Sequence, residues 1–245
     1  MRMARSGDRR TFLTGMSFCA GANLVNFANA ASPQPHVVLL GDSILDNKPY
    51  VGERPCVIEQ VQTVLGNKAQ ATLLAVDGST TDDLFDQIRN LPASTTHVFI
   101  STGGNDALAR QDVLMRKVDI VGEALHELYQ IQADFGKKYR AMLEAALAKV
   151  PNVAVCTIYD PNFPEAVRQQ VSVAALASFN DRITREAFSK GVPLIDLRLL
   201  FSNKDDYANP IEPSTKGGQK IAQVIAKIVN HHDFSQKQSR VYDRV

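Results

Sequence analysis

A three-layer α/β/α fold, with a five-stranded parallel sheet between two layers of helices, is predicted by two features of the sequence. From residue 36 onward, short apolar runs alternate with longer stretches that place apolar residues three and four positions apart. Strands and helices that alternate in this way form a parallel sheet covered by helices. The 245 residues are 44% hydrophobic and 22% charged, which is sufficient for one sizeable core.

The elements follow one another in a regular order. The predicted strands are 36–40, 71–75, 97–101, 153–158 and 192–195. The predicted helices are 54–65, 81–90, 112–149, 164–190 and 214–230. The stretch 112–149 is too long for one crossover helix, so we expect two helices there and a cap or wall over the functional site. Residues 233–245 are polar, and we expect them to form a flexible tail after a domain that spans residues 31–232.

The first thirty residues have the features of an export signal. Residues 8–13, which include Arg9 and Arg10, resemble a twin-arginine motif, and a weakly apolar stretch then leads to a cleavage-like triplet at 28–30. This pattern predicts a periplasmic or secreted protein whose signal peptide is residues 1–30. The alternatives are a disordered basic tail on a cytoplasmic protein or, less compatible with the sequence, a lipoprotein modified at Cys19.

Composition excludes several classes of function. The formal net charge is +1 and no basic stripe is present, so we expect no nucleic-acid partner. The apolar stretch of the export signal is too interrupted by polar residues to span a bilayer, and we also expect no integral membrane segment in the mature chain. Cys56 and Cys156 are predicted to be unpaired, and neither the cysteines nor the five histidines have metal-ligand spacing. No metal and no organic cofactor is expected.

Polar and glycine-rich segments follow the predicted strands. In an open parallel sheet, ligands bind outside the carboxyl ends of the strands. The segments at these ends are Gly41-Asp42-Ser43, Asp77-Gly78-Ser79, Gly103-Gly104-Asn105-Asp106 and the loop 205–214. The sequence therefore predicts that these segments meet at one edge of the sheet.

These residue types suit attack on a carbonyl group. The hydroxyl of Ser43 is the candidate nucleophile, provided that a base removes its proton. The backbone N–H groups of Ser43 and Gly78 and the side-chain amide of Asn105 are candidate donors to the oxyanion. We expect Asp42 and Asp106 to organise the local backbone rather than to react.

Together, these segments resemble the blocks of the SGNH, or GDSL, hydrolase superfamily. The resemblance covers residues 36–230, with Ile44 as a mild departure from leucine in the first block. It implies a flavodoxin-like fold and an esterase- or lipase-like acyl hydrolase that acts on ester bonds through Ser43. The expected partner is a small-molecule ester or acylated substrate, and the sequence does not choose among the substrates of the superfamily.

The fourth block departs from the pattern of that superfamily. Where its members have Asp-x-x-His, this sequence has Asn209-Pro210-Ile211-Glu212. Three hypotheses remain open. In the first, Glu212 replaces histidine as the base, with Asn209 orienting it and its carboxylate about 2.6–3.2 Å from the serine hydroxyl. In the second, His126 reaches the site from the long helical stretch. In the third, the protein is a catalytically impaired ligand-binding or accessory protein.

Overall fold

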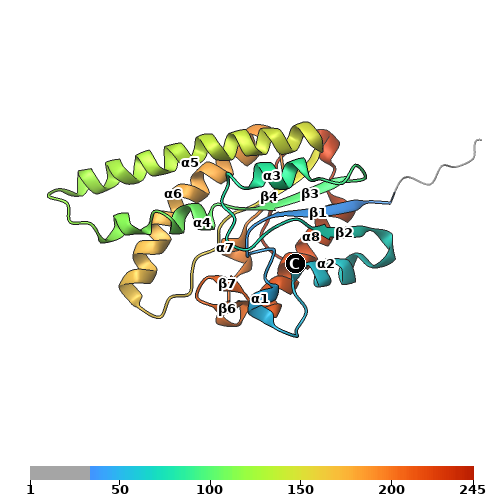
Figure 1. Cartoon of the computed structure of the whole chain (residues 1–245), viewed down its shortest axis with the longest axis horizontal. Helices are drawn as coiled ribbons and strands as arrows, with labels where there is room; N and C mark the ends of the chain where they lie inside the picture. Colours follow the sequence, from blue (N-terminus) through green and yellow to red (C-terminus); the bar gives the residue numbers. More distant parts are fainter. Residues whose placement is uncertain (1–33) are drawn as a thin grey trace, which may run out of the picture. The chain divides into compact units, whose positions relative to one another are not determined.

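The central sheet contains six parallel strands in the order β2-β1-β3-β4-β5-β8 (Figure 1). The structure is a computed structural model that describes residues 34–245, so the predicted export signal lies outside the described residues. The strands are β1 His36–Gly41, β2 Gln70–Leu73, β3 His97–Ser101, β4 Asn152–Cys156, β5 Leu194–Ile195 and β8 Val241–Tyr242. The predicted α/β class and parallel sheet are confirmed.

The sheet has one strand more than predicted, and this strand lies in the segment that we expected to be a flexible tail. The β5 residue Leu194 donates its N–H to the Arg240 carbonyl, and the N–H of Asp196 bonds to the Tyr242 carbonyl, both at 2.9 Å. Tyr242 is buried. A strand of two residues is too short to show a hydrophobic period, but the free backbone groups of β5 require partners.

Helices cover both faces of the sheet. Because successive side chains of a strand point to opposite faces, Val37 and Leu39 pack with α2 and α8, whereas Val38 and Leu40 pack with α3, α5 and α6. The helices are α1 Lys48–Val51, α2 Val57–Leu65, α3 Leu84–Arg89, α4 Gly104–Leu108, α5 Val121–Lys149, α6 Ala166–Lys190, α7 Leu197–Leu200 and α8 Thr215–His231. The 3₁₀ helices are η1 Gly66–Lys68, η2 Gln111–Met115, η3 Lys204–Asp206 and η4 Phe234–Gln236.

Local sequence signals fix the ends of these helices. The Ser214 hydroxyl accepts hydrogen bonds from the N–H groups of Lys216 and Gly217, which caps the start of α8. At the end of α6, Gly191 adopts a left-handed conformation that favours glycine. The stretch predicted to hold two helices contains η2 and the 29-residue helix α5. The N-terminal halves of α5 and α6 extend past the carboxyl ends of the strands (Figure 1).

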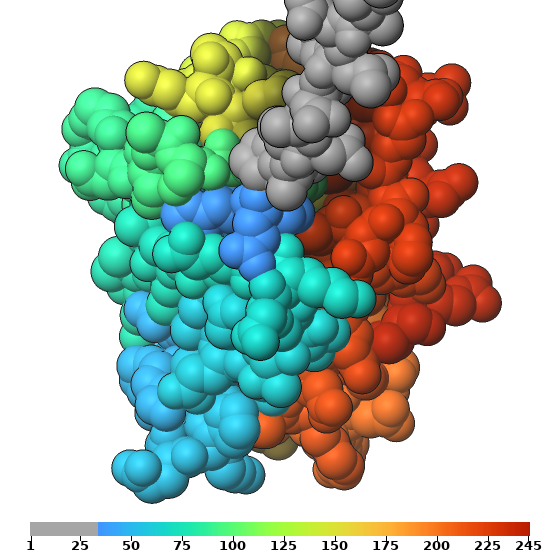
Figure 2. Space-filling model, turned by 90° about the vertical axis from the view of Figure 1, so that its right-hand side faces the viewer, coloured from blue at the N-terminus to red at the C-terminus, as the bar shows by residue number. Residues whose placement is uncertain are grey.

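The opposite end of the sheet is the one at which β1 begins (Figure 2). There the start of β1, in blue, lies between the light-blue to cyan segments of α2 and β2 and the red C-terminal segments.

Strand β2 forms one edge of the sheet, and the side chain of Gln62 covers part of that edge. The side-chain oxygen of Gln62 accepts the Ala71 N–H at 2.9 Å, while its Nε2 donates to the Ala69 carbonyl at 3.1 Å.

Membrane-spanning helices and disulfides are two further features on which residues 34–245 can be checked. Within this range no helix is both long enough and apolar enough to cross a membrane. Cys56 and Cys156 are both buried, and neither forms a disulfide. The prediction that these two cysteines are unpaired is confirmed.

Candidate active site

The candidate nucleophile Ser43 lies in a tight turn directly after β1. The turn depends on Gly41, because its φ of 139° favours glycine and because a Cβ there would overlap the Ser101 carbonyl oxygen. The Asp42 carbonyl accepts the N–H of Leu45 at 3.1 Å, and the Asp42 carboxylate accepts the N–H of Ile44 at 3.1 Å. Asp42 therefore makes the local backbone contact that we expected of it.

Ser43 and Glu212 meet at the carboxyl edge of the sheet. The hydroxyl of Ser43 donates a hydrogen bond to Oε1 of Glu212 at 3.1 Å, although the two residues lie far apart in the sequence. Each residue is only 6% exposed. This distance lies within the range in which a base can accept a proton from a nucleophile.

The backbone on both sides of Glu212 is held by residues from other loops. Glu212 belongs to β7 Glu212–Pro213, which pairs in antiparallel fashion with β6 Tyr207–Asn209. Tyr159 donates its hydroxyl to the Ile211 carbonyl at 2.7 Å, and Asn47 donates its amide to the Pro213 carbonyl at 3.1 Å. No local sequence pattern relates Asn47 or Tyr159 to a loop so distant in the chain, so neither contact could be predicted from the sequence.

Asn209 does not hold the carboxylate of Glu212 in the way that we expected. Its side chain is exposed, and its Oδ1 accepts the N–H of Ile211 at 2.9 Å. This contact closes the turn between β6 and β7, a local role typical of asparagine. The second carboxylate oxygen of Glu212, Oε2, is buried and has no hydrogen-bond partner in the described structure.

The burial of two carboxyl groups changes their acidity. Burial raises the pKa of Glu212 to about 7; the hydrogen bond from Ser43 opposes this rise, and the charge of Asp77 adds to it. Burial likewise raises the pKa of Asp42 to about 8, against the hydrogen bond from the Ile44 N–H, and the charges of Glu212 and Asp106 add to the rise. Glu212 is therefore able to exchange its proton near neutral pH.

The candidate oxyanion donors differ in their placement. Asn105 lines the same cavity as Ser43 and follows Gly103, whose φ of 110° turns the chain into α4. Its Nδ2 donates to the Ser79 carbonyl at 2.9 Å, which leaves the second N–H of the amide available. Gly78 is exposed and is not among the cavity-lining residues of the described chain. The oxyanion role of Gly78 stays a prediction.

Buried side chains connect the loops that carry these residues. The carboxylate of Asp106 accepts the N–H of Thr81 at 2.9 Å and the Thr81 hydroxyl at 3.0 Å. Gln87 accepts the N–H of Gly41 at 2.7 Å and donates to the Gly41 carbonyl at 2.9 Å. Gln87 was not among the predicted site residues, although a glutamine on the apolar face of an amphipathic helix is a signal of such a buried contact.

His126 does not contribute to this site. It lies on an exposed part of α5 and does not line the cavity that contains Ser43. Within residues 34–245 there is also no group of three or more His, Cys, Asp or Glu side chains arranged to hold a metal ion. Among the described residues, Glu212 is the side chain that offers Ser43 an acceptor for its proton.

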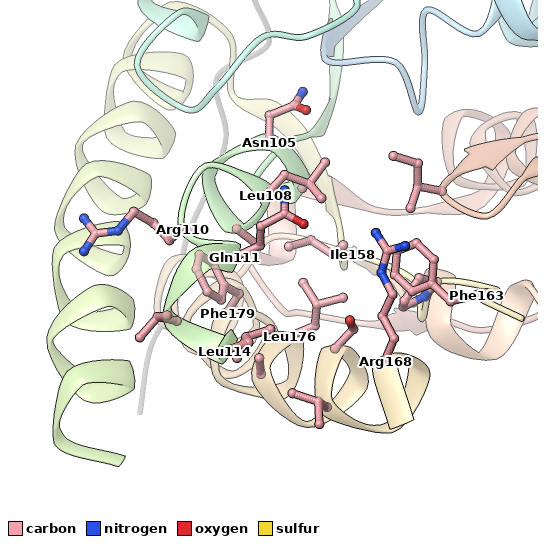
Figure 3. A pocket seen from close by; sticks show the side chains of 18 of the residues that line it. Asn105, Leu108, Arg110, Gln111, Leu114, Ile158, Phe163, Arg168, Leu176 and Phe179 are labelled. Carbon is pink, nitrogen blue, oxygen red and sulfur yellow. The ribbon is translucent and has the colours of Figure 1, made fainter. Parts of the chain in front are cut away.

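A cavity of about 600 Å³ opens from this pair of residues. Its inner end is formed by Ser43, Asn105 and Glu212, and its walls come from the α4–η2 segment, α5 and α6. Leu108, Gln111 and Leu114 of the α4–η2 segment face Leu176 and Phe179 of α6 (Figure 3). A cavity of this volume is typical of small-molecule binding sites.

Comparison with known proteins identifies the family of this chain. A model of the GDSL-like Lipase/Acylhydrolase family matches residues 39–220. The chain belongs to this family. The matched range contains Ser43, Asn105 and Glu212, so the blocks recognised in the sequence lie within the family match. No match was found among curated proteins.

Solved structures of a phospholipase, a lipase/acylhydrolase and an acetylxylan esterase share the fold at low sequence identity. Phospholipase A1 from Streptomyces albidoflavus NA297 is 18% identical, with a TM-score of 0.58 over 81% of this chain and 100% of that one. The lipase/acylhydrolase from Enterococcus faecalis is 17% identical, with a TM-score of 0.56 over 80% and 95% of the two chains. The acetylxylan esterase Axe2 from Geobacillus stearothermophilus is 15% identical, with a TM-score of 0.56 over 82% and 95%. Family and fold together support a hydrolase that acts on esters.

Proposed function

We propose that this protein hydrolyses carboxylic esters, with Ser43 as the nucleophile and Glu212 as the general base. The observation that carries the proposal is the 3.1 Å hydrogen bond from the Ser43 hydroxyl to Glu212 at the inner end of the cavity. A carboxylate with a pKa of about 7 is a stronger base than an ordinary glutamate and is still ionised in about half of the molecules at neutral pH.

The reaction proceeds in two halves. Ser43 Oγ attacks the ester carbonyl carbon as its proton moves to Glu212 Oε1, and the negative oxygen that forms is stabilised by the free N–H of Asn105 and the backbone N–H of Ser43. The bond to the alcohol then breaks, and Glu212 gives the alcohol its proton. Water next attacks the acyl-serine and passes a proton to Glu212. Release of the carboxylic acid returns that proton to Ser43.

The way in which Glu212 is oriented explains how it could take the place of the usual histidine. An imidazole ring needs a second side chain to fix its orientation, whereas both oxygens of a carboxylate are equivalent acceptors. In this site the orientation of Glu212 comes from its backbone, through the β6–β7 pairing and the contacts of Tyr159 and Asn47. A glutamate therefore needs no aspartate at position 209, where a second negative charge would disfavour its ionised form.

A fluorophosphonate probe tests the nucleophile directly. We expect stoichiometric labelling of the wild-type protein that disappears in Ser43→Ala. Glu212→Gln should lower kcat for a small aryl ester by at least about 10²-fold, because the glutamine cannot accept the proton. Thr80→Ala, at a polar site outside the cavity, is the matched control. Absence of labelling across a broad pH range would overturn the proposal in favour of a ligand-binding protein.

We also propose that the protein is exported to the periplasm or secreted, on the basis of its N-terminal sequence. Arg9 and Arg10 lie in a twin-arginine-like motif that precedes an apolar stretch and a cleavage-like triplet. Fractionation of bacterial cells should place the wild-type protein outside the cytoplasm, whereas a variant with lysine at both positions should remain inside. Equal distribution of the two proteins would contradict this proposal.

A further inference from the structure

The cavity beside Ser43 is polar at its inner end and apolar along most of its length. Ser43, Asn105 and Glu212 form the inner end, while the middle of the cavity is bounded by Leu108 and Leu176 among other apolar side chains (Figure 3). Such a wall offers few hydrogen-bonding partners to a ligand. A sugar or another polyhydroxyl group would replace only part of its hydrogen bonds to water there, through side chains such as Gln111 and Arg168, and this loss costs affinity.

One wall is a stripe of apolar residues on α6. Val167, Val171, Ala175 and Phe179 recur every four residues and all line the cavity. The rise of an α-helix gives this stripe a length of about 18 Å. Exposure falls along it, from 73% at Val167 through 39% at Val171 to 4% at Phe179, so the stripe leads from the surface to the buried end. An elongated ligand fits this wall better than a compact one.

The mouth of the cavity is also apolar. Met115 of η2 lines the cavity and is 87% exposed, and Val121 and Leu125 at the start of α5 are exposed as well. Six of the fourteen exposed large apolar side chains in residues 34–245 belong to the segment 115–129, and two more lie on the α6 stripe. Of these exposed residues, Met115, Val167 and Val171 line the cavity, so apolar side chains lie where it meets the surface, as expected for the entry of an apolar ligand.

We propose that this cavity binds the long unbranched alkyl chain of an amphiphilic ester, with the ester carbonyl at Ser43. The proposal rests on the proposed function for the reaction, but binding of the chain does not depend on turnover. Each further CH₂ group that enters the cavity should raise kcat/KM about fourfold until the cavity is filled, because apolar surface leaves water. A short acyl group leaves most of the wall without a partner.

A chain-length series of p-nitrophenyl esters, from acetate through octanoate to laurate, tests this proposal. The wild-type protein should prefer laurate to acetate, and Ala175→Phe should lower that preference at least about tenfold, because the ring occupies the middle of the wall. Ser172→Phe, nearer the mouth, is a second blocking variant. Ala174→Phe, on the solvent face of the same helix, should retain the wild-type preference. A preference for acetate, or an equal effect of Ala174→Phe, would overturn the proposal.

Binding to Ser43→Ala separates this proposal from the catalytic one. Lauric acid should bind that variant in calorimetry, and adding Ala175→Phe should weaken the binding at least about tenfold. If the wild-type protein cleaves no ester but lauric acid binds, the proposed reaction fails and the chain site stands. If acetate is cleaved but lauric acid does not bind, the chain site fails alone. Comparison of methyl laurate with dodecyl acetate shows whether the chain enters as the acyl group or as the alcohol.

Discussion

The two long helices α5 and α6 each have a half that packs on the sheet and a half that surrounds the cavity. In the sheet-packed halves, Leu143 and Ile183 are completely buried. In the cavity halves, apolar residues such as Leu125 and Val167 remain more than half exposed. The apolar face continues along each helix while its partner changes from strands to an open cavity. One part of each helix therefore contributes to the stability of the core, while the other surrounds the cavity for which we propose ligand binding.

Two buried carboxylates differ in a similar way, one in the sheet-packed half of α6 and one at the inner end of the cavity. Beside the sheet, Glu186 receives hydrogen bonds from the guanidinium of Arg140 at 2.7 and 3.0 Å. At the inner end of the cavity, Glu212 accepts one hydrogen bond from Ser43, and its Oε2 has no partner in the described structure. Hydrogen bonds from a cation favour the ionised form of a carboxylate, whereas burial without such a partner raises the pKa of the carboxyl group. This difference in pairing distinguishes a structural carboxylate, Glu186, from the proposed base, Glu212.

The largest expected effect is a difference in the free energy of unfolding between two leucine-to-alanine substitutions, one in each half of α5. Leu143→Ala should lower the free energy of unfolding by about 2–5 kcal/mol, because it opens a cavity in a packed core. Leu125→Ala should change it by no more than about 0.5 kcal/mol, because that side chain already contacts water. Urea denaturation followed by circular dichroism measures both. Comparable losses of stability would contradict the division of the helix.

The second effect is the pH dependence of catalysis. If Glu212 is the base, as proposed, kcat/KM for a short ester should be constant above about pH 8, reach half that value near pH 7 and fall further toward acid, because the pKa of this group is about 7. The fall approaches about tenfold for each pH unit, as expected for a single ionising group. Initial rates on p-nitrophenyl acetate in buffers of constant ionic strength give the midpoint. A midpoint near 4.5, the ordinary pKa of glutamate, would show that burial does not tune this group.

A smaller effect concerns stability. The pKa of Glu212 is higher in the folded chain than its ordinary value of 4.5, so its contribution to stability is complete below that value and is lost as the pH rises through about 7. Glu212→Gln should therefore stabilise the protein above neutral pH relative to acid pH, by about 1–2 kcal/mol after allowance for solvent screening in the cavity. Urea denaturation at both pH values tests this, and a gain that is independent of pH would contradict it.

The smallest expected effect is a shift in the pH at which kcat/KM reaches half of its maximum. The negative charge of Asp77 raises the pKa of Glu212, so Asp77→Asn should move the pH–rate profile toward acid by less than about one unit. Asp86→Asn, at an exposed position on α3 where the aspartate pairs with Arg89, is the matched control. Equal midpoints for wild type and Asp77→Asn would remove Asp77 from the tuning of the base.

The regular elements of the fold could be predicted because their signals are local. The four residues Val37–Leu40 of β1 are all apolar, and the cap at Ser214 precedes a periodic apolar stretch, so β1 and α8 follow from a few residues each. Strand β8 could not be predicted in this way, since its two residues gain their structure from pairing with β5. Its place depends on the completed sheet rather than on its own sequence.

The candidate site divides in a similar way. Ser43 and Asn105 could be found because each follows a strand in a recognisable turn, and Glu212 because it occupies the place of a histidine. The contacts that hold Glu212 could not, because Asn47 and Tyr159 reach its loop from distant parts of the chain. The contact expected from Asn209 differs for a physical reason: an exposed asparagine in a tight turn bonds to its own backbone.

Both edges of the sheet are unsuited to addition of a further strand. At one edge, the side chain of Gln62 occupies backbone groups next to β2 that another chain would otherwise use. At the other, β8 offers only two residues and is followed by the charged pair Asp243 and Arg244. Short, charged or occupied edges discourage intermolecular β-pairing. The fold thus carries protection against intermolecular β-pairing at both edges of its sheet.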